Sequence, residues 1–276
     1  MLRLAVIGKD VSRSLSPVMH RFLLGKMGER CTYECVSIPP ERFSADVGTL
    51  FSRFDAFNVT IPFKAEILPF LARTEGDAKT FSAVNTVVSA TRTGYNTDGL
   101  GFMLMLDNAG VDVSGKRVLV LGAGGAGRSC ICKLAERGAQ VFAYGRNFQR
   151  LQKVWTEMGN FTPLESIPPA AYDVICNCTG IGMHDTIGQT PTVRTPRGEF
   201  PVGEALLAGC TAAVDLIYEP AQSEFLRIAA SLGKKTLNGG AMLFYQAYYA
   251  DCIYLERTPS PAEAKQYYME YSGGKA

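Results

Sequence analysis

The sequence predicts an α/β protein with two domains, the second of them built on a doubly wound parallel sheet. The chain has 276 residues, of which 47% are hydrophobic and 20% are charged, and this length suits about two globular domains of ~150 residues each. Short apolar runs alternate with longer amphipathic stretches from end to end, which is typical of α/β folds. One apolar run leads directly into a glycine-rich loop at residues 122–127, and a helical pattern follows it.

The first hundred residues contain four short apolar runs that we interpret as strands. The expected strands cover residues 2–7, 32–37, 56–61 and 83–89, and the expected helices between them include residues 17–27 and 42–52. The third run leads into the heptapeptide NVTIPFK, in which Pro62 is expected to end the strand and Lys64 to begin the next helix. A tight hairpin is expected at residues 92–94, where the sequence reads RTG.

A second series of alternating elements follows a turn at residues 114–116. Its expected strands cover residues 117–121, 140–144, 173–177, 212–217 and 235–237, and its expected helices cover residues 127–137 and 222–232. Five short strands spaced by helices in ~120 residues are typical of a nucleotide-binding sheet. Two more helices are expected at 241–257 and 261–271, the second opening with Ser260 and Pro261 in a capping-box pattern.

Composition and charge disfavour several classes of function. The 28 basic and 26 acidic residues give a net charge of +2, so no field of one sign favours nucleic acid or a membrane surface. No apolar stretch reaches the ~20 residues of a membrane span, and the first residues are charged too early for a signal peptide. The eight cysteines form no C-x-x-C pair and there are only two histidines, which disfavours a metal site. We interpret the cysteines as buried, reduced thiols of a cytoplasmic protein in preference to disulfides.

The glycine-rich loop has the context of a dinucleotide-binding motif. Residues 118–128 read VLVLGAGGAGR, a β-branched strand followed by G-x-G-x-x-G and a helix. Gly122 permits the tight turn, Gly124 lets the backbone approach a pyrophosphate, and Gly127 allows close packing of helix on strand. The candidate cofactor-binding residues of this loop are Gly122, Ala123, Gly124, Gly125 and Ala126. The alternative is a glycine-rich turn that binds no ligand.

The end of the next strand favours NADP over NAD. NAD-binding sheets place an acidic residue ~20 positions after the glycine loop, where it holds the ribose 2′-hydroxyl. Here the segment contains Gly145, Arg146, Asn147 and Arg150 and no acidic residue. We expect Arg146, with Arg150, to pair with a 2′-phosphate; the alternative is that Arg146 is an ordinary surface charge.

Two serines near the N-terminus lie beside an expected helix start. Ser16 is a good N-cap residue and Pro17 a good first helical residue. Ser14 and Ser16 together place two hydroxyls next to the free N–H groups of the helix, an environment that suits a carboxylate. Capping without any ligand explains the pair equally well.

Taken together, five segments and the glycine loop resemble the shikimate dehydrogenase family. The segments read SLSPVMH at residues 14–20, NVTIPFK at 58–64, AVNT at 83–86, NTDGLG at 96–101 and NGGAMLFYQA at 238–247. They cover essentially the whole chain in the family's order. The resemblance implies an N-terminal α/β substrate domain with a mixed sheet, formed by residues 1–101 and 239–276, and a Rossmann domain for NADP at residues 102–238.

The resemblance also implies a reaction and roles for individual residues. The reaction is the reversible, NADPH-dependent reduction of 3-dehydroshikimate to shikimate in aromatic amino-acid biosynthesis. Lys64 would be catalytic, with Asp98 orienting it. The implied substrate-binding residues are Ser14 and Ser16 for the carboxylate, Thr60, Asn85, Asp98 and Gln246 for the ring hydroxyls, and Tyr218 at the edge. Leu216 and Gly239 would line the nicotinamide side.

Some positions depart from the family's pattern and leave alternatives open. The family commonly has Asn-Arg-Thr where this chain has Gly145, Arg146 and Asn147, so the strictness of the NADP preference is not fixed. A quinate/shikimate dehydrogenase with relaxed use of NAD and NADP is the alternative enzyme. A catalytically silent dinucleotide sensor is disfavoured, because it predicts the loss of Lys64 or Asp98. Family members occur as monomers and as homodimers, and both stay open here.

Overall fold

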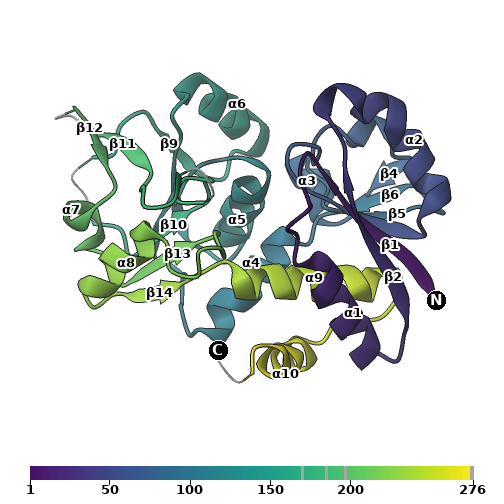
Figure 1. Ribbon diagram of the computed structural model, residues 1–276. Helices are drawn as coiled ribbons and strands as arrows, with labels where there is room; N and C mark the ends of the chain where they lie inside the picture. Colours follow the sequence, from purple (N-terminus) through teal and green to yellow (C-terminus); the bar gives the residue numbers. More distant parts are fainter. Residues whose placement is uncertain (169–170, 184–185, 196–197, 274–276) are drawn as a thin grey trace. The chain divides into compact units, whose positions relative to one another are not determined.

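The computed structural model describes residues 1–168, 171–183, 186–195 and 198–273. The chain divides into two compact units (Figure 1). The first unit comprises Met1–Gly101 and Leu243–Ala276, and the second comprises Phe102–Met242. The first unit is therefore discontinuous in the sequence, whereas the second is one uninterrupted segment.

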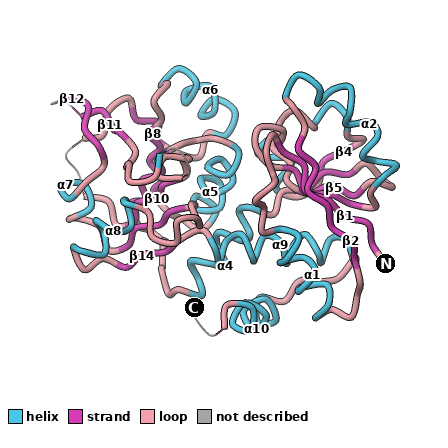
Figure 2. Tube along the Cα trace, viewed as in Figure 1, coloured by secondary structure: helices cyan, strands magenta, loops and turns pink. Residues whose placement is uncertain are grey.

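The first unit is built on a mixed six-stranded sheet in the order β2-β1-β3-β5-β6-β4. These strands are β1 (Leu2–Gly8), β2 (Cys31–Ser37), β3 (Ala56–Val59), β4 (Arg73–Thr74), β5 (Thr86–Val88) and β6 (Thr93–Tyr95). Strands β2, β1 and β3 pair in parallel, whereas β5 is antiparallel to both β3 and β6. The mixed sheet expected for the N-terminal domain is confirmed, and Figure 2 shows its strands in magenta.

The two faces of this sheet have separate hydrophobic cores, because neighbouring residues of β1 point to opposite sides. Ala5 and Ile7 face a core shared with α2 (Phe43–Arg53). Leu4 and Val6 face a core shared with α1 (Ser16–Lys26) and the end of α9 (Gly240–Tyr254).

The helices of the second core are joined by a polar contact. His20 Nδ1 of α1 lies 2.6 Å from Asp251 Oδ1 of α9, and both side chains are fully buried. The last helix, α10 (Pro261–Tyr271), begins as expected with Ser260 accepting a hydrogen bond from the Glu263 N–H.

Three local predictions for the first unit are wrong. Lys64 does not begin a helix; it lies in a run of turns before a short 3-10 helix, Leu68–Phe70. The hairpin turn lies at residues 89–92, before the expected position, and Arg92 adopts a positive φ of 46° in it. Ser16 is the first residue of α1, whose N-cap position is Leu15 without a side-chain hydrogen bond. The short elements β4 and α3 (Asp77–Phe81) were not expected.

The second unit is built on a parallel six-stranded sheet in the order β14-β13-β10-β7-β8-β9. Its strands are β7 (Arg117–Leu121), β8 (Gln140–Tyr144), β9 (Thr162–Leu164), β10 (Val174–Asn177), β13 (Ala212–Asp215) and β14 (Lys235–Leu237). Strand order reverses beside β7, with β8 on one side and β10 on the other, as in a doubly wound sheet. The predicted Rossmann architecture is confirmed, with β9 as an additional strand.

Helix α4 (Asp98–Asn108, whose first turn belongs to the first unit) leads into the first of these strands, and the other helices of the second unit lie between the strands in the sequence. These other helices are α5 (Gly125–Glu136), α6 (Phe148–Met158), α7 (Glu204–Leu207) and α8 (Glu224–Ser231). One core packs Leu119 and Ile175 of the sheet against Phe225 of α8. A two-stranded antiparallel sheet, β11 (Thr192–Thr195) and β12 (Gly198–Pro201), was not expected.

All eight cysteines are free in the structure. Their expected burial is only partly right: five are buried, Cys31 and Cys178 are half-buried, and Cys35 is exposed. Among the described residues, no group of His, Cys, Asp and Glu side chains is placed to hold a metal ion. None of the described helices has both the length and the apolar character of a membrane span.

Candidate active site and cofactor loop

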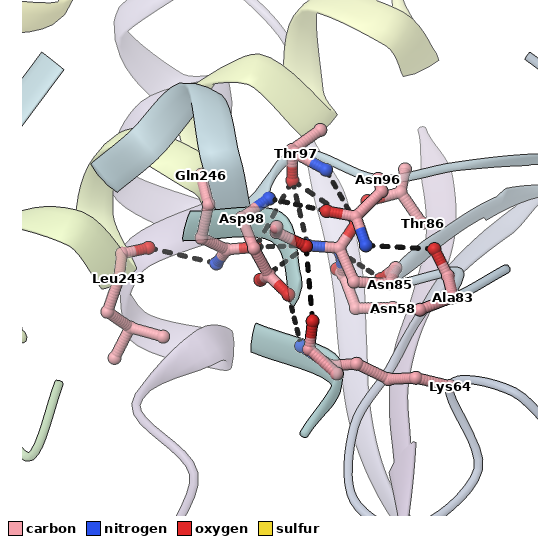
Figure 3. A network of polar contacts seen from close by, with 12 residues as sticks. Asn58, Lys64, Ala83, Asn85, Thr86, Asn96, Thr97, Asp98, Leu243 and Gln246 are labelled. Atoms are coloured by element: carbon pink, nitrogen blue, oxygen red, sulfur yellow. Dashed lines mark hydrogen bonds and ion pairs between the residues drawn. The ribbon is translucent and has the colours of Figure 1, made fainter. Parts of the chain in front are cut away.

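Lys64 and Asp98 form an ion pair in the first unit (Figure 3). The Lys64 Nζ lies 2.5 Å from the Asp98 Oδ2, and the two side chains are only 14% and 8% exposed. Asp98 is the first residue of α4, where the positive end of the helix dipole favours a carboxylate. A paired lysine and aspartate that retain slight exposure can exchange a proton with a bound molecule.

The turn that carries Lys64 is anchored on both sides of it. The neighbouring Phe63 is fully buried and stacks on Phe43 of α2, with ring centroids 4.1 Å apart. The Lys64 carbonyl accepts a hydrogen bond of 2.7 Å from the Val84 N–H. The lysine backbone is therefore fixed by tertiary contacts, and only its long side chain reaches Asp98.

Asn85 is the centre of the polar network around this pair (Figure 3). Its Nδ2 donates to Asp98 Oδ1 at 2.8 Å and lies within hydrogen-bond distance of Thr97 Oγ1 at 3.0 Å and Gln246 Oε1 at 3.2 Å. Its Oδ1 accepts from the Thr97 N–H at 2.9 Å and from the Thr86 hydroxyl at 2.8 Å. Asn85 is 2% exposed; these bonds fix the orientation of its amide and satisfy its buried polar atoms.

Two further asparagines hold the backbone of this network. Asn58 Nδ2 of β3 donates to the Asn85 carbonyl at 3.2 Å. Asn96 Oδ1 accepts from the Asp98 N–H at 3.0 Å, and its Nδ2 donates to the Ala83 carbonyl at 2.8 Å. Four of the site residues predicted from the sequence thus lie together within the first unit: Lys64, Asn85, Asp98 and Gln246.

Ser14 and Ser16 lie together at the start of α1, and neither forms the expected side-chain cap of that helix. The Ser14 hydroxyl donates to the Ser16 Oγ at 3.1 Å and accepts from the Ser16 N–H at 3.2 Å. Thr60 is half-buried at the end of β3, and its hydroxyl forms no hydrogen bond within the described part of the chain. A Cβ on Gly8 would lie 2.6 Å from the Thr60 Cγ2, so glycine is required beside this threonine.

The glycine-rich loop between β7 and α5 fits the backbone of a dinucleotide. Gly122 has a φ of 95°, and a Cβ there would lie 2.8 Å from the Thr179 Cγ2. A Cβ on Gly127 would lie 2.2 Å from the Gly122 carbonyl oxygen, so this glycine permits the close packing of helix on loop. Gly124 is exposed with open space around it. The first turn of α5 has neither an acidic residue nor a side-chain cap, which leaves its N–H groups suited to phosphate.

The segment after β8 presents two arginines to solvent. Arg146 and Arg150 are exposed, and neither forms an ion pair with another residue that the structure describes. Asn147 is instead the N-cap of α6, where its Oδ1 accepts from the Arg150 N–H at 2.9 Å. The Gly145 position has no heavy atom within 4 Å of a notional Cβ. The two guanidinium groups and the open glycine can accommodate a 2′-phosphate. The Asn147 side-chain oxygen, Oδ1, is already hydrogen-bonded to the Arg150 N–H.

Leu216 and Gly239 lie against each other at the carboxyl ends of the strands of the second unit's sheet. A Cβ on Gly239 would lie 2.0 Å from the Leu216 carbonyl oxygen, and the Gly239 N–H donates to the Ile217 carbonyl at 2.9 Å. Tyr218, two residues after Leu216, is half-buried; its burial raises the pKa of its phenol. These residues lie after the carboxyl ends of β13 and β14, where open α/β sheets bind ligands.

Comparison with known proteins identifies the family. The model of the shikimate dehydrogenase substrate binding domain matches residues 6–87. A shikimate dehydrogenase (NADP(+)) of Caldicellulosiruptor saccharolyticus is 35% identical over 268 residues, which cover 93% of each chain. The chain belongs to the shikimate dehydrogenase family.

Solved structures of the shikimate dehydrogenase family have the same fold over nearly the full length. Shikimate dehydrogenase 1 from Peptoclostridium difficile superposes with a TM-score of 0.85 at 27% identity, covering 98% of each chain. The Thermus thermophilus enzyme, solved in complex with NADP(H) and shikimate, has a TM-score of 0.82 at 32% identity. It covers 97% of this chain and 98% of its own.

Four residues of this family member's network were missed by sequence reasoning. Each of them bonds to Asn85 or to the start of α4: Asn58, Thr86, Asn96 and Thr97. Each lies inside a motif that was recognised, but only its neighbours were assigned a role. In the sequence, each is a polar side chain within an otherwise apolar or turn-forming run. That pattern indicates a site residue only once Asn85 and Asp98 are known to be hydrogen-bonded to each other.

Proposed function

We propose that this chain catalyses the reversible, NADPH-dependent reduction of 3-dehydroshikimate to shikimate, a step of aromatic amino-acid biosynthesis in the cytoplasm. The observation that carries the proposal is the slightly exposed Lys64–Asp98 pair, which is bonded into a network with Asn85 and Gln246. It occurs in a chain whose second unit also has an uncapped glycine-loop helix for a dinucleotide. The relatives carry NADP(+) in their names, which favours NADP over relaxed use of NAD.

Lys64 is proposed as the general acid of the reduction. NADPH supplies the hydride to the carbonyl carbon. As the C=O π bond breaks, negative charge grows on the carbonyl oxygen, and an adjacent ammonium stabilises this charge and donates a proton to it. The neutral Lys64 amine then recovers a proton from solvent. Asp98, 2.5 Å from the Nζ, orients the ammonium, and in the oxidation direction the same groups accept the proton.

The remaining polar residues of the first unit are proposed to select the substrate. Ser14 and Ser16 place two hydroxyls at the start of α1 and would donate to the carboxylate of the substrate. Asn85, Asp98, Gln246 and the unbonded Thr60 hydroxyl would bond the ring hydroxyls, with Tyr218 of the second unit at the substrate's edge. Because such groups are left unpaired by an analogue that lacks a hydroxyl, the site can reject it by as much as ~10⁴-fold.

The second unit is proposed to hold NADP through two groups of residues. The loop residues Gly122, Ala123, Gly124, Gly125 and Ala126 would bind the pyrophosphate at the start of α5. Arg146 and Arg150, with Gly145 and Asn147 beside them, would bind the 2′-phosphate, since both guanidinium groups are exposed and free of ion pairs among the described residues. Leu216 and Gly239 would line the nicotinamide.

The test is turnover of the purified protein on shikimate and on quinate, with NADP and with NAD. The expected result is NADP-linked oxidation of shikimate at a kcat/KM at least ~10-fold above that of the other three combinations. Equal rates with quinate, or with NAD, would replace the proposal by the quinate/shikimate alternative. Absence of any absorbance change at saturating NADPH and 3-dehydroshikimate would reject the enzyme altogether.

The role of Lys64 is tested separately by Lys64→Ala, with Lys79→Ala as the matched control. Lys79 is an exposed lysine of α3 in the same unit. Removing a general acid typically lowers the rate ~10²- to 10⁴-fold, and the KM for shikimate should change by only a few-fold. The control should match the wild type. A Lys64→Ala enzyme with undiminished kcat would remove Lys64 from the mechanism.

A further inference from the structure

Asp215 is a fully buried carboxylate at the carboxyl end of β13 that no catalytic step uses. Its Oδ1 accepts from the Asn177 Nδ2 at 3.0 Å and from the Ile217 N–H at 3.1 Å. Its Oδ2 accepts from the Ser223 hydroxyl at 2.5 Å. One side chain therefore satisfies a side-chain amide, a backbone amide and a hydroxyl from three different segments of the second unit.

The donors lie in two loops at the ligand-binding end of the sheet, Asn177 at the end of β10 and both Ile217 and Ser223 between β13 and α8. Asn177 is the last residue of β10, and its Oδ1 accepts from both the N–H and the hydroxyl of Thr179, at 3.0 and 2.7 Å. The Thr179 methyl in turn packs where a side chain at Gly122 would be. Through Asn177, the Asp215 carboxylate is linked to the loop that backs the glycine-rich turn.

On the other side, Asp215 fixes the loop that carries Leu216. The Leu216 N–H donates to the Asn177 carbonyl at 2.9 Å, and the Ile217 carbonyl accepts from the Gly239 N–H at 2.9 Å. With the Ile217 N–H bonded to Asp215, the peptide groups on both sides of Ile217 are held. Ser223, the third donor, also caps α8 by accepting from the Leu226 N–H at 3.3 Å.

A carboxylate is a costly way to connect two loops, the one after β10 and the one between β13 and α8. Burial raises its pKa to about 6, although the three hydrogen bonds act in the opposite direction. Buried charges destabilise a fold unless they are well bonded, and apolar side chains often serve stability as well or better. A geometric requirement explains the carboxylate more simply, because two oxygens can bond three donors at fixed angles whereas apolar packing leaves the loops free to shift.

We propose that Asp215 is a positioning residue for hydride transfer: it holds Leu216 and the Gly239 turn in the register that the nicotinamide requires. This rests on the proposed function, which assigns Leu216 and Gly239 to the nicotinamide side. The pyrophosphate and the 2′-phosphate bind elsewhere on the unit, at the start of α5 and beside Arg146. Asn177 keeps its own bonds to Thr179 and to the Ile181 carbonyl without Asp215, so the glycine-rich turn stays supported. Loss of Asp215 should therefore disturb the reacting end of the cofactor and spare its adenosine end.

The experiment compares Asp215→Ala with Asp215→Asn. Alanine leaves all three donors without an acceptor, and a misplacement of ~1 Å at the reacting end can lower a rate ~10²-fold. We expect kcat to fall ~10- to 100-fold while the affinity for adenosine 2′,5′-bisphosphate, which lacks nicotinamide, stays within about 2-fold. Asparagine keeps one oxygen for Asn177 and Ile217 and can donate to Ser223 instead of accepting. It should therefore restore kcat to within about 3-fold of the wild type.

Asp173→Ala is the matched control, and Ser223→Ala is a second variant should Asp215→Ala fail to fold. Asp173 lies just before the other end of β10, where its Oδ2 accepts from the Arg117 N–H at 2.8 Å. Its loss should lower stability without changing kcat per folded molecule. Ser223→Ala removes one of the three donors to Asp215 and should lower kcat in the same direction by a smaller factor.

The outcomes separate this inference from the function on which it rests. If the wild type does not oxidise shikimate with NADP, the proposed function fails whatever Asp215 does. If the wild type is active and both Asp215→Ala and Ser223→Ala keep its kcat, only the positioning role is refuted. Equal losses of kcat and of adenosine 2′,5′-bisphosphate affinity would make Asp215 a residue of general folding importance and would also overturn the inference.

Discussion

Replacing Asp215 by asparagine should change how the free energy of unfolding depends on pH. The side chain is fully buried, and burial raises its pKa from 3.8 to about 6. The hydrogen bonds from Ser223, Ile217 and Asn177 lower the pKa but do not offset the burial. In the unfolded chain the carboxyl group returns to its ordinary pKa of ~3.9. The neighbouring Cys176 thiol has its own pKa raised well above 9 by burial, so it stays neutral throughout this range.

The direction and size of the effect follow from these two pKa values. Because the pKa is higher in the folded state, the folded protein binds the proton more tightly than the unfolded chain does. The resulting stability is complete below pH ~4 and is lost as the pH rises through ~6. A difference of about two pKa units corresponds to ~3 kcal/mol, at ~1.4 kcal/mol per unit. Asparagine does not titrate, so the unfolding free energy of the variant minus that of the wild type should rise by ~3 kcal/mol between pH ~4 and ~7.

Urea unfolding followed by tryptophan fluorescence measures this difference. The chain has a single tryptophan, Trp155, which lies in α6 of the unit that contains Asp215. Ser223→Ala, which removes a hydrogen bond that lowers the Asp215 pKa, should extend the loss of stability to higher pH. A difference between Asp215→Asn and wild type that is constant from pH ~4 to ~7, or that falls with rising pH, would refute the reasoning.

Three other substitutions test the binding assignments. Ser14→Ala combined with Ser16→Ala should raise the KM for shikimate at least ~10-fold, through lost hydrogen bonds to a charged group. NADPH affinity, measured by fluorescence titration, should be unchanged, and parallel weakening of both ligands would contradict the assignment. Arg146→Ala should raise the KM for NADP ~10-fold or more with little effect on NAD; an unchanged ratio of the two kcat/KM values would argue against its contact with the 2′-phosphate. Gly239→Ala places a Cβ 2.0 Å from the Leu216 carbonyl oxygen and should lower both the melting temperature and the affinity for NADP. A wild-type melting temperature would show that the loop adapts.

Sequence reasoning predicted the sheet of the second unit well because its strands are short, apolar and separated by clear turns. The bounds of β7, β8 and β14 are those expected from the sequence. The meeting of Lys64, Asn85, Asp98 and Gln246 was also predicted, although the residues come from four separate segments. That prediction came from the family resemblance, since spacing alone does not bring Gln246 to Asn85 across 161 residues.

The sequence prediction put the hairpin turn after β5 at the wrong residues because Gly94 lies in a strand and not in the turn. Its glycine suggested a turn, but it lies in β6, where a Cβ would be 2.5 Å from a Leu71 methyl and 2.8 Å from a Val84 methyl. The glycine permits close packing within the sheet, and the turn instead uses Arg92 at a positive φ.

The conformation around Lys64 could not be predicted for a related reason. The Lys64 carbonyl bonds to the Val84 N–H and the Ile61 carbonyl to the Lys9 N–H, so tertiary partners take the groups that a helix would use. Such long-range bonds leave no local pattern in the sequence. Asp215 was overlooked for the same reason: at the end of a strand it resembles a surface residue until its three donors are seen.

The division of the first unit into two chain segments has a consequence for the order of events during synthesis. The second unit is continuous, and all its residues leave the ribosome before Leu243 does. The first unit instead needs its C-terminal segment, because Gln246 must reach Asn85 and Asp251 must reach His20 across 231 residues. Contacts so distant in sequence form late and slowly, and domains tend to fold in the order of their synthesis. We therefore expect the dinucleotide-binding unit to be folded in the nascent chain while the residues around Lys64 still await the final helices.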